Sequence, residues 1–451
     1  MASAAEQLAA NLNFGALAKA TELKQRIWFT LGALLVYRLG TYIPLPGIDP
    51  AAWDQIFRSQ AGGILGMFNM FAGGGINRMA IFALNIMPYI SASIIIQLMT
   101  TVSPQLEALK KEGEAGRKIM NQYTRYLTVG LAAVQAYFIA VGLESAGNVV
   151  AEPGLFFRIS TTITLTGGTV FLMWLGEQIT SRGIGNGISL IILAGIVAEL
   201  PSALVGMFEL GRQGALSTGL ILLIMVMAVA VIAFIVFMER AQRRLLIQYP
   251  KRQVGNRVFE GQSSHLPLKL NTSGVIPPIF ASSLLLLPTT IASFNAQGQG
   301  PEWLSFITTQ LAHGRPLFLL FYIGLIVFFA FFYTAIVFNP RDVAENMRKN
   351  GGYIPGVRPG KPTEEYIDNI LTKVTVPGSL FLALVAIMPA FASRLGVSPT
   401  FATFFGGTSL LIMVGVALDT LKQIESYLLM RHYDGFMKSG KLRGRQAAVP
   451  S

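Results

Sequence analysis

The feature that most constrains this chain is a series of apolar runs, several of which reach the length of about 20 residues that a helix needs to cross the hydrocarbon core of a bilayer. A soluble core of this size would not need runs that long. Only 13% of the residues are charged, whereas soluble globular domains carry roughly 25%. The sequence therefore predicts a polytopic membrane protein.

Hydropathy predicts ten membrane-spanning helices along the chain. The predicted spans are roughly 24–43, 78–101, 119–143, 156–178, 187–206, 216–238, 273–294, 316–338, 374–393 and 401–427. Because the number of spans is even, both termini are expected on the same side of the membrane.

The basic residues test this topology, because positively charged loops stay predominantly on the cytoplasmic side. Of the 35 lysine and arginine residues, 26 fall on the side that holds the N-terminus, 6 on the other side, and the rest in or at the ends of spans. Both termini are therefore expected in the cytoplasm. The same distribution favours cytoplasmic loops over nucleic-acid binding as the reason for the net charge of +12.

Two of the predicted cytoplasmic loops are unusually large, at Glu239–Leu270 and Asn339–Lys373. Both are basic and well supplied with glycine and proline. Loops longer than about 12–15 residues are more often functional than short ones. Two interpretations remain open: a solvated loop that faces lipid headgroups, or a docking surface for a cytosolic partner.

A short apolar segment at 62–75, GGILGMFNMFAGGG, departs from the ten-helix pattern on the outer side. Its apolar stretch from Ile64 to Ala72 would be about 14 Å long as a helix, which is too short to span a bilayer. The glycines on both sides can act as flexible joints. The segment is expected to be a re-entrant or movable element, or alternatively an interfacial helix packed statically against the bundle.

Two other segments are unusual for a simple bundle. The predicted seventh span contains Pro277-Pro278, so a kink is expected, either because the span lines a cavity or because it is a kinked packing helix. The fifth span opens with RGIGNG at 182–187, which lacks the spacing and the preceding strand of a dinucleotide-binding turn. A close helix–helix turn is the expected role of this segment.

The sequence offers no catalytic or metal-binding pattern, and no cofactor is expected. No Walker A motif occurs, the chain has no cysteines, and its three histidines are scattered, which argues against a P-loop ATPase, thiol chemistry and a structural zinc site. Ionisable residues are scarce in the predicted spans, whereas proton- or ion-coupled transporters usually carry them near the midplane. A sodium site built from backbone carbonyls would escape this test.

Several ordered stretches carry a resemblance to a known family. They are IPLPGID at 43–49, MFNMFAGG at 67–74, IMPYISASIIIQL at 86–98, KKEGEAGRK at 110–118, MWLGEQITSRGIGNGIS at 173–189, SHLPLK at 264–269, GVIPPIFASS at 274–283, FNPRDVAENMRKNGGYIPGVRPG at 338–360 and GGTSLLI at 406–412. From about Leu23 to Arg445, the chain resembles the SecY family, whose members are the large subunit of the bacterial Sec translocon. Long, ordered matches of this kind are more specific than any short motif.

The resemblance implies an all-α membrane protein in which ten transmembrane helices form two inverted five-helix halves around a central hourglass pore with a short plug helix. The N-terminal half would comprise residues 1–210, with the plug at 62–75. The C-terminal half would comprise residues 211–430, with the two large loops at 239–270 and 339–373. Residues 431–451 would form a cytoplasmic tail.

The resemblance also assigns roles to individual residues. The implied pore ring consists of six isoleucines: Ile86, Ile90, Ile188, Ile192, Ile279 and Ile412. The implied plug contains Ile64, Leu65, Met67, Phe68, Asn69, Met70 and Phe71. The implied lateral gate, between spans two and three on one side and seven and eight on the other, contains Gln97, Gln135 and Asn271. The implied docking residues in the large loops are Arg252, Arg257 and Arg358.

The physics of a ring of isoleucines fits this implied role. Branched apolar side chains make a narrow, poorly wetted constriction that offers ions no replacement for their lost hydration. The pairs 86/90 and 188/192 are each spaced i, i+4, so each pair projects from one helix face. Without the resemblance, all six would be interpreted as ordinary core isoleucines.

The function implied by the resemblance is a channel, not an enzyme, that conducts unfolded preproteins across the bacterial inner membrane and releases transmembrane segments laterally into lipid. Its implied partners are the SecE and SecG subunits, the SecA ATPase, the ribosome and signal-recognition-particle pathway, signal peptides and nascent chains, and membrane lipids. Two other classes are compatible with the hydropathy pattern: a small-solute secondary transporter, which would need a midplane site, and a structural membrane protein without a pore.

Overall fold

The computed structural model describes residues 21–60, 64–145, 147–214, 216–250, 252–254, 257–259, 263–295, 315–394, 401–402 and 407–438. In this part of the chain, each of the ten predicted spans overlaps a helix. These helices are α3 (Thr21–Gly40), α6 (Met87–Val102), α8 (Glu114–Ser145), α9 (Leu155–Arg182), α10 (Gly187–Arg212), α11 (Thr218–Arg240), α12 (Ile276–Asn295), α14 (Pro316–Val337), α16 (Lys361–Arg394) and α18 (Thr408–Lys438). The helix α18 extends into the predicted tail, and residues 439–451 lie outside the described part.

Six helical stretches among the described residues are both long and apolar enough to cross a membrane. They are Glu114–Ser145, Leu155–Arg182, Gly187–Arg212, Thr218–Arg240, Pro316–Lys349 and Lys361–Ala392. Met87–Val102 and Ile276–Leu285 are shorter apolar helices. Large apolar side chains on α11 are exposed, among them Leu222, Val226 and Phe237. Such an extended apolar surface is what lipid would cover.

The second predicted span is helical over only part of its length. Residues 72–86 form a series of turns, and the helix begins at Met87 instead of near residue 78. Asn85 has a positive φ of 48°, which ends any upstream helix, and Pro88 lies in the first turn, where its missing N–H costs no hydrogen bond. These two residues explain why hydropathy alone placed the start too early.

Pro277 and Pro278 likewise lie in the first turn of α12, because residues 270–275 form turns before the helix starts at Ile276. The break that the sequence indicated therefore precedes the helix. The expectation of a kink at these prolines is wrong, since a proline in the first helical turn removes no intrahelical bond.

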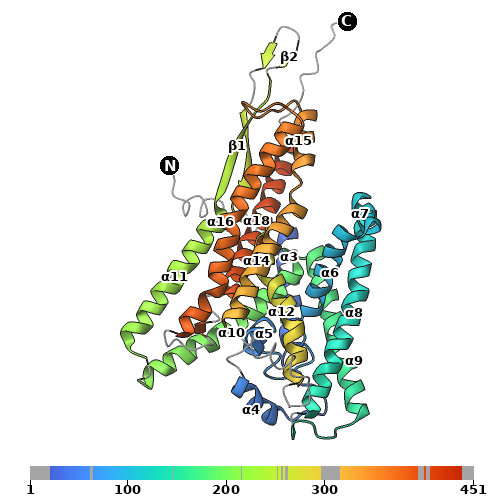
Figure 1. Ribbon diagram of the computed structural model, residues 1–451, viewed down its shortest axis with the longest axis vertical. Helices are drawn as coiled ribbons and strands as arrows, with labels where there is room; N and C mark the ends of the chain where they lie inside the picture. The colour runs from blue at the N-terminus through green and yellow to red at the C-terminus, as the bar shows by residue number, and fades with distance from the viewer. Residues whose placement is uncertain are drawn as a thin grey trace.

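The predicted cytoplasmic loops contain regular structure. In the first loop, β1 (Gln242–Gln248) pairs antiparallel with β4 (Ser263–Lys269), from Gln242 opposite Lys269 to Gln248 opposite Ser263. Beyond them, β2 (Arg252–Val254) pairs with β3 (Arg257–Phe259). In the second loop, α15 (Pro340–Lys349) precedes α16. Figure 1 shows β1 and α15 at the same end of the molecule.

Apolar side chains hold this β-hairpin against the helices. Leu245 of β1 and Leu268 of β4 are buried with Ile370 and Val374 of α16. Ile247 is buried in a second cluster with residues of α15 and α16. The alternation of Leu245 and Ile247 along the strand is the period of two that a half-buried strand requires.

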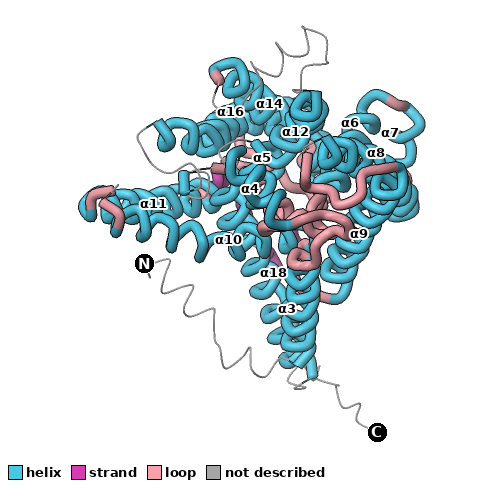
Figure 2. Tube along the Cα trace, turned by 90° about the horizontal axis from the view of Figure 1, so that it is seen from below, coloured by secondary structure: helices cyan, strands magenta, loops and turns pink. Residues whose placement is uncertain are grey.

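The helices surround a short central element. The helix α8 packs against both α6 and α9, α14 packs against both α12 and α16, and α10 contacts α3, α9, α11 and α18. Figure 2 shows α5 (Ile64–Phe71) near the middle of the helices, with α7 (Pro104–Lys111) at the periphery, and Figure 1 shows α4 (Pro50–Gln60) below α5. The arrangement therefore places the eight-residue α5 inside the bundle.

Close backbone approaches fix α9 in this arrangement. A Cβ atom at Gly187 would collide with the carbonyl oxygen of Gly176, so α10 begins in direct backbone contact with α9. The expectation of a close helix–helix turn at 182–187 is confirmed. At Gly168 a Cβ atom would collide with the carbonyl oxygen of Ile81, whereas at the adjacent Gly167 it would meet nothing within 4 Å.

We expect Gly168→Ala to destabilise the protein, because the Ile81 backbone must shift, at a cost of roughly 1–3 kcal/mol for overpacking. Gly167→Ala on the same helix should leave stability unchanged and serves as the matched control. Thermal unfolding in detergent measures both variants. Equal melting temperatures for the two variants would contradict the packing assigned to Gly168.

Candidate pore and plug

Five of the six predicted ring isoleucines line one cavity at the centre of the helices. Ile86 directly precedes α6, and the others come from helices: Ile90 from the start of α6, Ile192 from α10, Ile279 from α12 and Ile412 from α18. The remaining lining residues are Phe71, Asn85 and Met87. Residues separated by more than 300 positions in the sequence thus converge on one point.

This cavity is small and apolar. Its volume is about 10 Å³, which is at the lower limit of the space that one water molecule needs. Ile86 and Ile412 are each 1% exposed, and Ile279 is half-buried. Because the lining offers almost no hydrogen-bond partner, a hydrated ion would lose its water shell there without compensation.

Ile188 lies apart from the other five. It is half-buried and packs at the edge of the same apolar core. Its side chain lies against Gly176 of α9, where an added Cβ atom would be 3.0 Å from Cγ1 of Ile188. The structure therefore directs Ile188 toward α9, one helical turn away from Ile192.

The predicted plug forms the helix α5, which covers one side of the isoleucine cavity. Phe68, Met70 and Phe71 are buried, and Phe71 itself lines the cavity. The described backbone of Ile64, Leu65 and Met67 belongs to the same helix. The helix ends at Phe71 and is followed by Gly73 and Gly74, which have φ values of 62° and 80°, the left-handed conformation that glycine adopts readily.

The other side of α5 faces helices of the C-terminal part of the chain. Met70 and Phe71 border a second cavity of about 30 Å³ with residues of α14, α16 and the start of α18. Tyr322 and Thr408 share a hydrogen bond of 2.7 Å in its wall. This cavity is large enough for a water molecule, so α5 lies between the small isoleucine cavity and a larger one.

Polar groups hold the C-terminal end of α5. Asn85 Nδ2 donates to the carbonyl oxygen of Phe71 at 2.6 Å, and the guanidinium of Arg38 donates to the carbonyl of Gly73. Asn69 Oδ1 accepts from the backbone N–H of Asn77 at 2.8 Å. The sequence interpretation missed Asn85 and Arg38, because only the fold brings them to the end of α5.

A glycine of α10 allows this end of α5 to approach closely. A Cβ atom at Gly195 would lie 2.6 Å from the carbonyl oxygen of Phe71 and 3.1 Å from the N–H nitrogen of Gly73. Both distances are below an ordinary van der Waals contact. The position of α5 therefore depends on the absence of a side chain at Gly195.

The three predicted gate residues do not bond to one another. Asn271 is 3% exposed, and its Nδ2 donates to Glu239 Oε1 at 2.5 Å and to the carbonyl of Gly274 at 3.0 Å. Gln97 bonds within its own helix, to Ser93 Oγ at 3.4 Å. Gln135 is buried on α8, with no bonding partner for its Oε1 atom in the described part of the chain.

The helices at the expected gate nevertheless lie side by side. The helix α12 contacts both α6 and α8, and Ser283 of α12 donates to the sulfur of Met87 at 3.9 Å. This weak polar contact and apolar packing join the two sides. An interface of this kind can separate without exposing strong, unpaired polar groups.

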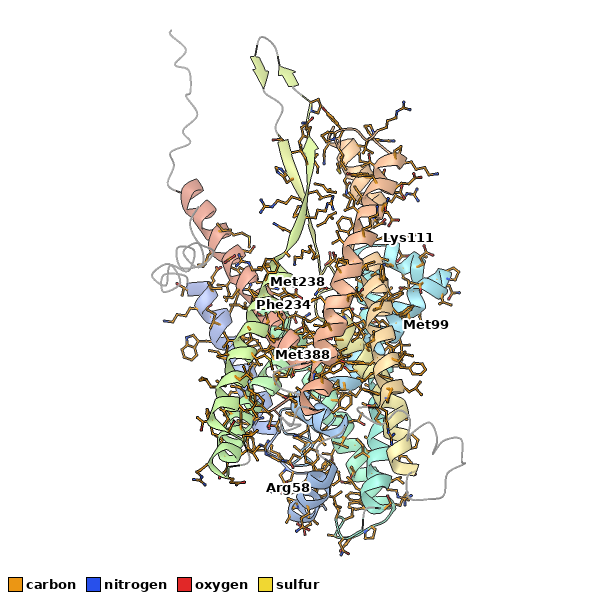
Figure 3. All side chains as sticks on the ribbon, turned by 60° about the vertical axis from the view of Figure 1, so that its left-hand side comes forward. Arg58, Met99, Lys111, Phe234, Met238 and Met388 are labelled. Carbon is orange, nitrogen blue, oxygen red and sulfur yellow. The ribbon has the colours of Figure 1, made fainter. Side chains whose placement is uncertain are left out.

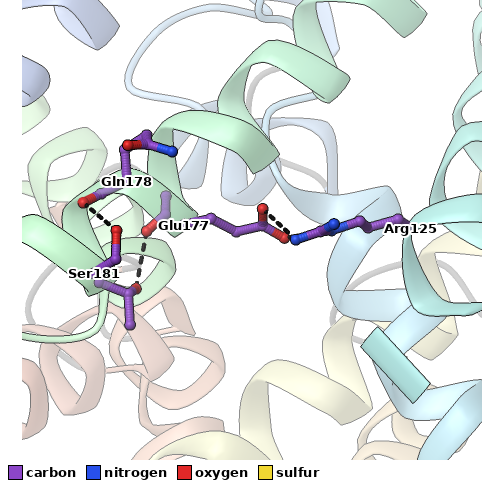
Figure 4. A network of polar contacts seen from close by, with 6 residues as sticks. Arg125, Glu177, Gln178 and Ser181 are labelled. Atoms are coloured by element: carbon purple, nitrogen blue, oxygen red, sulfur yellow. Dashed lines mark hydrogen bonds and ion pairs between the residues drawn. The ribbon is translucent and has the colours of Figure 1, made fainter. Parts of the chain in front are cut away.

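Two ionisable residues within the spans neutralise each other. Arg125 of α8 and Glu177 of α9 form a bidentate pair, with Nε–Oε1 and Nη2–Oε2 distances of 2.8 Å each. Figure 4 shows this pair bridging the two helices, with Gln178 adjacent to Glu177 on α9 and Ser181 one turn further along the helix. A fork-to-fork pair positions two helices and leaves neither charge free to bind a transported ion.

The predicted docking residues lie at the end that carries the hairpin. Arg252 and Arg257 belong to β2 and β3, and Arg358 is exposed in the turn before α16, where its carbonyl accepts from Thr363 Oγ1 at 2.8 Å. A hollow nearby is bordered by Arg341, Glu345, Arg348, Lys361 and Glu364. Among the described residues, no group of three or more histidine, aspartate and glutamate side chains could hold a metal ion.

Comparison with known proteins gives a consistent result. A sequence model of the SecY family matches residues 80–421. The chain is 54% identical over 426 residues to the protein translocase subunit SecY of Rickettsia conorii, covering 94% of this chain and 97% of that protein. It is 50% identical over 426 residues to the subunit of the same name from Escherichia coli, covering 94% and 96%.

Solved structures share the fold. A structure described as a protein-conducting channel superimposes with a TM-score of 0.63 at 17% identity, covering 91% of this chain and 93% of that one. The channel of a canine ribosome–channel complex from the endoplasmic reticulum superimposes with a TM-score of 0.60 at 16% identity, again covering 91% and 93%.

We expect Gly195→Ala to push the end of α5 away from α10, because the new methyl group would meet the Phe71 carbonyl. An overpacking cost of roughly 1–3 kcal/mol corresponds to about a fivefold to 150-fold loss in occupancy of the observed position. Ion leak through the resting protein in vesicles measures the displacement.

Gly206→Ala on the same helix is the matched control, because a Cβ atom there would meet nothing within 4 Å. Its leak should equal that of the unmodified chain. A Gly195→Ala variant that folds and leaks no more than Gly206→Ala would contradict the role assigned to this contact.

Proposed function

The chain belongs to the SecY family and is a multi-pass membrane protein that forms a protein-conducting channel; on this premise we propose that the isoleucine cavity is its pore constriction and α5 the plug that closes it. The observation that carries the proposal is the convergence of Ile86, Ile90, Ile192, Ile279 and Ile412 on one cavity, with Phe71 of α5 against them. The six-membered ring implied by the family resemblance also includes Ile188, which lies against Gly176 of α9 and outside the lining of this cavity.

The ring seals by shape and by its lack of polar groups. Isoleucine side chains fill the centre so closely that the remaining space holds at most about one water molecule. They come from four helices, α6, α10, α12 and α18, so the opening can widen as those helices separate. Ions gain no ligands there, whereas a passing polypeptide only displaces side chains.

The plug supports the seal from one side. In the observed state α5 packs between α10 and the second cavity, and its last residue contacts the ring. Conduction of an unfolded chain requires α5 to leave this position. The glycines at 73 and 74, in the left-handed conformation, provide a joint about which the helix can turn.

The lateral gate is proposed between α6 and α8 on one side and α12 and α14 on the other. An apolar signal peptide or transmembrane segment would enter between α6 and α12 because it replaces one apolar interface by another. Binding that favours the separated state shifts the population toward the open channel. Gln97 lies on α6 and Gln135 on α8, whereas Asn271 lies in the turn before α12 and bonds to Glu239 of α11. The two halves, 1–210 and 211–430, would move relative to each other.

Partners would dock at the end of the molecule that carries the hairpin and α15. Figure 3 shows Lys111 of α7 toward this end and Arg58 of α4 at the opposite end. We propose that this end is cytoplasmic, with both termini on that side in the bacterial inner membrane, as the distribution of basic residues indicates. Its basic residues would bind the ribosome and the SecA ATPase, while SecE and SecG would complete the channel.

Replacement of a ring isoleucine should open a leak. We expect Ile90→Gly or Ile412→Gly to raise the ion conductance of resting vesicles several-fold, because removal of the side chain leaves a wettable gap. Ile163→Gly is the matched control, since Ile163 of α9 is 66% exposed and does not line the cavity. Unchanged conductance in both ring variants, in correctly folded protein, would refute the pore assignment.

Charge reversal at the docking surface should impair secretion and leave the channel intact. We expect Arg358→Glu to lower SecA-dependent secretion at least several-fold. The substitution places a negative charge where an exposed positive charge would contact the partner, so attraction would become repulsion. Arg58→Glu, at the opposite end, is the control. Normal secretion by a membrane-inserted Arg358→Glu variant would argue against docking through this residue.

A further inference from the structure

Three consecutive residues before and at the start of α6 contact three different parts of the proposed channel. Asn85 holds the end of α5. Ile86 lines the isoleucine cavity and is 1% exposed. Met87 accepts a hydrogen bond from Ser283 of α12, on the other side of the proposed gate. All three residues border the same cavity.

The geometry of Asn85 is specific. Its φ of 48° lies in the left-handed region, which asparagine tolerates better than most residues. Its side chain is 2% exposed, and its amide donates to the Phe71 carbonyl over 2.6 Å. That carbonyl is at the last residue of α5, so the bond joins the plug directly to the residue that precedes the gate helix.

A second bond holds the same end of α5 from a different helix. Arg38 of α3 donates to the carbonyl of Gly73, two residues beyond Phe71. Arg38 also donates to Tyr42 Oη over 3.0 Å and lies over the Tyr42 ring at 4.9 Å. The helix α3 packs against α9 and α10, away from the proposed gate, so Arg38 is tied to the body of the molecule.

We propose that Asn85 is the positioning residue that couples opening of the gate helix α6 to release of the plug. This inference rests on the proposed function of α5 and the isoleucine cavity. When α6 moves away from α12, the 85–87 turn moves with it, and the Asn85–Phe71 bond breaks. The Arg38–Gly73 bond remains and keeps the end of α5 attached.

The coupling follows from the steep distance dependence of hydrogen bonds. An N–H···O bond is useful up to a donor–acceptor distance of about 3.2 Å, so a movement of α6 by about 1 Å removes most of its contribution. The same movement shifts Ile86 at the ring and withdraws Met87 from Ser283. One displacement thereby widens the constriction and frees the plug together.

Two substitutions remove the amide donor and keep the left-handed backbone accessible. Asn85→Asp preserves the shape but places an acceptor against the Phe71 carbonyl, and Asn85→Gly removes the side chain. Asn148 provides the matched control, because it has a φ of 43° and is exposed between α8 and α9. Asn148→Asp and Asn148→Gly should behave as the unmodified chain.

Distances between spin labels distinguish coupling from a general structural role. The chain has no cysteines, so label pairs can be introduced without background. One pair, Gly66→Cys with Phe208→Cys, reports the position of α5 relative to α10. The other pair, Met99→Cys with Leu284→Cys, reports the separation of α6 and α12.

In the unmodified chain, a signal peptide should change both distances together. In both Asn85 variants, we expect the α5–α10 distance to lengthen without any signal peptide, while the α6–α12 distance stays unchanged. Resting ion leak should rise several-fold in the same samples. The Asn148 variants should show neither change.

Two results would overturn the proposal. One is an α5–α10 distance and leak equal to those of the unmodified chain in both Asn85 variants. The other is a lengthening of both distances together in the absence of signal peptide, which would mean that Asn85 stabilises the whole closed fold. If Ile90→Gly leaks and the Asn85 variants do not, the coupling fails while the pore assignment stands. If neither Ile90→Gly nor Ile412→Gly leaks, the pore assignment itself fails.

Discussion

The irregular backbone at residues 72–86 must satisfy its polar groups inside a bundle of apolar helices, and the rest of the site depends on this constraint. Non-helical backbone is tolerated at membrane depth only where protein or a water-filled cavity supplies its hydrogen bonds. Here Ile81 N–H bonds to the carbonyl of Ile43 at 3.0 Å, and Leu45 N–H bonds to that of Met79 at 3.0 Å. A second irregular segment, which contains Ile43 and Leu45, thus holds these turns in place. The helix α6 therefore begins only at Met87, and α5 and the isoleucine cavity meet at the first residues of α6.

Around this support, the channel combines rigid and yielding contacts. Backbone approaches at Gly168, Gly187 and Gly195 leave no room for adjustment, and the Arg125–Glu177 pair ties α8 to α9. The contact between α6 and α12 is mostly apolar by comparison, as is the ring. The proposed gate would need both properties, since the helices on each side would keep their shape while the interface between them opens.

Much of the architecture could be predicted from the sequence, because membrane-spanning length is a local property of each apolar run. The start of α6 was misplaced because the positive φ of Asn85 depends on its tertiary contact with Phe71. The hairpin in the first loop was missed, although the alternation of Leu245 and Ile247 carries a strand signal. The ring could not be found by periodicity, since its members come from four helices; the family resemblance supplied it, and the structure brings five of the six together. The bonding of Asn271 to Glu239 likewise depends on contacts distant in sequence.

Cross-linking of a stalled translocation intermediate tests most directly whether a polypeptide passes through the isoleucine cavity. Single cysteines at Ile90, Ile279 and Ile412 in this cysteine-free chain would be combined with a cysteine in the middle of a stalled preprotein. A cysteine at Val226 of α11, which is 61% exposed, reports contact from the lipid-facing side. Disulfides should form at the three cavity positions and not at position 226. Disulfide formation at position 226 with none at the cavity positions would contradict the passage of the chain through this constriction.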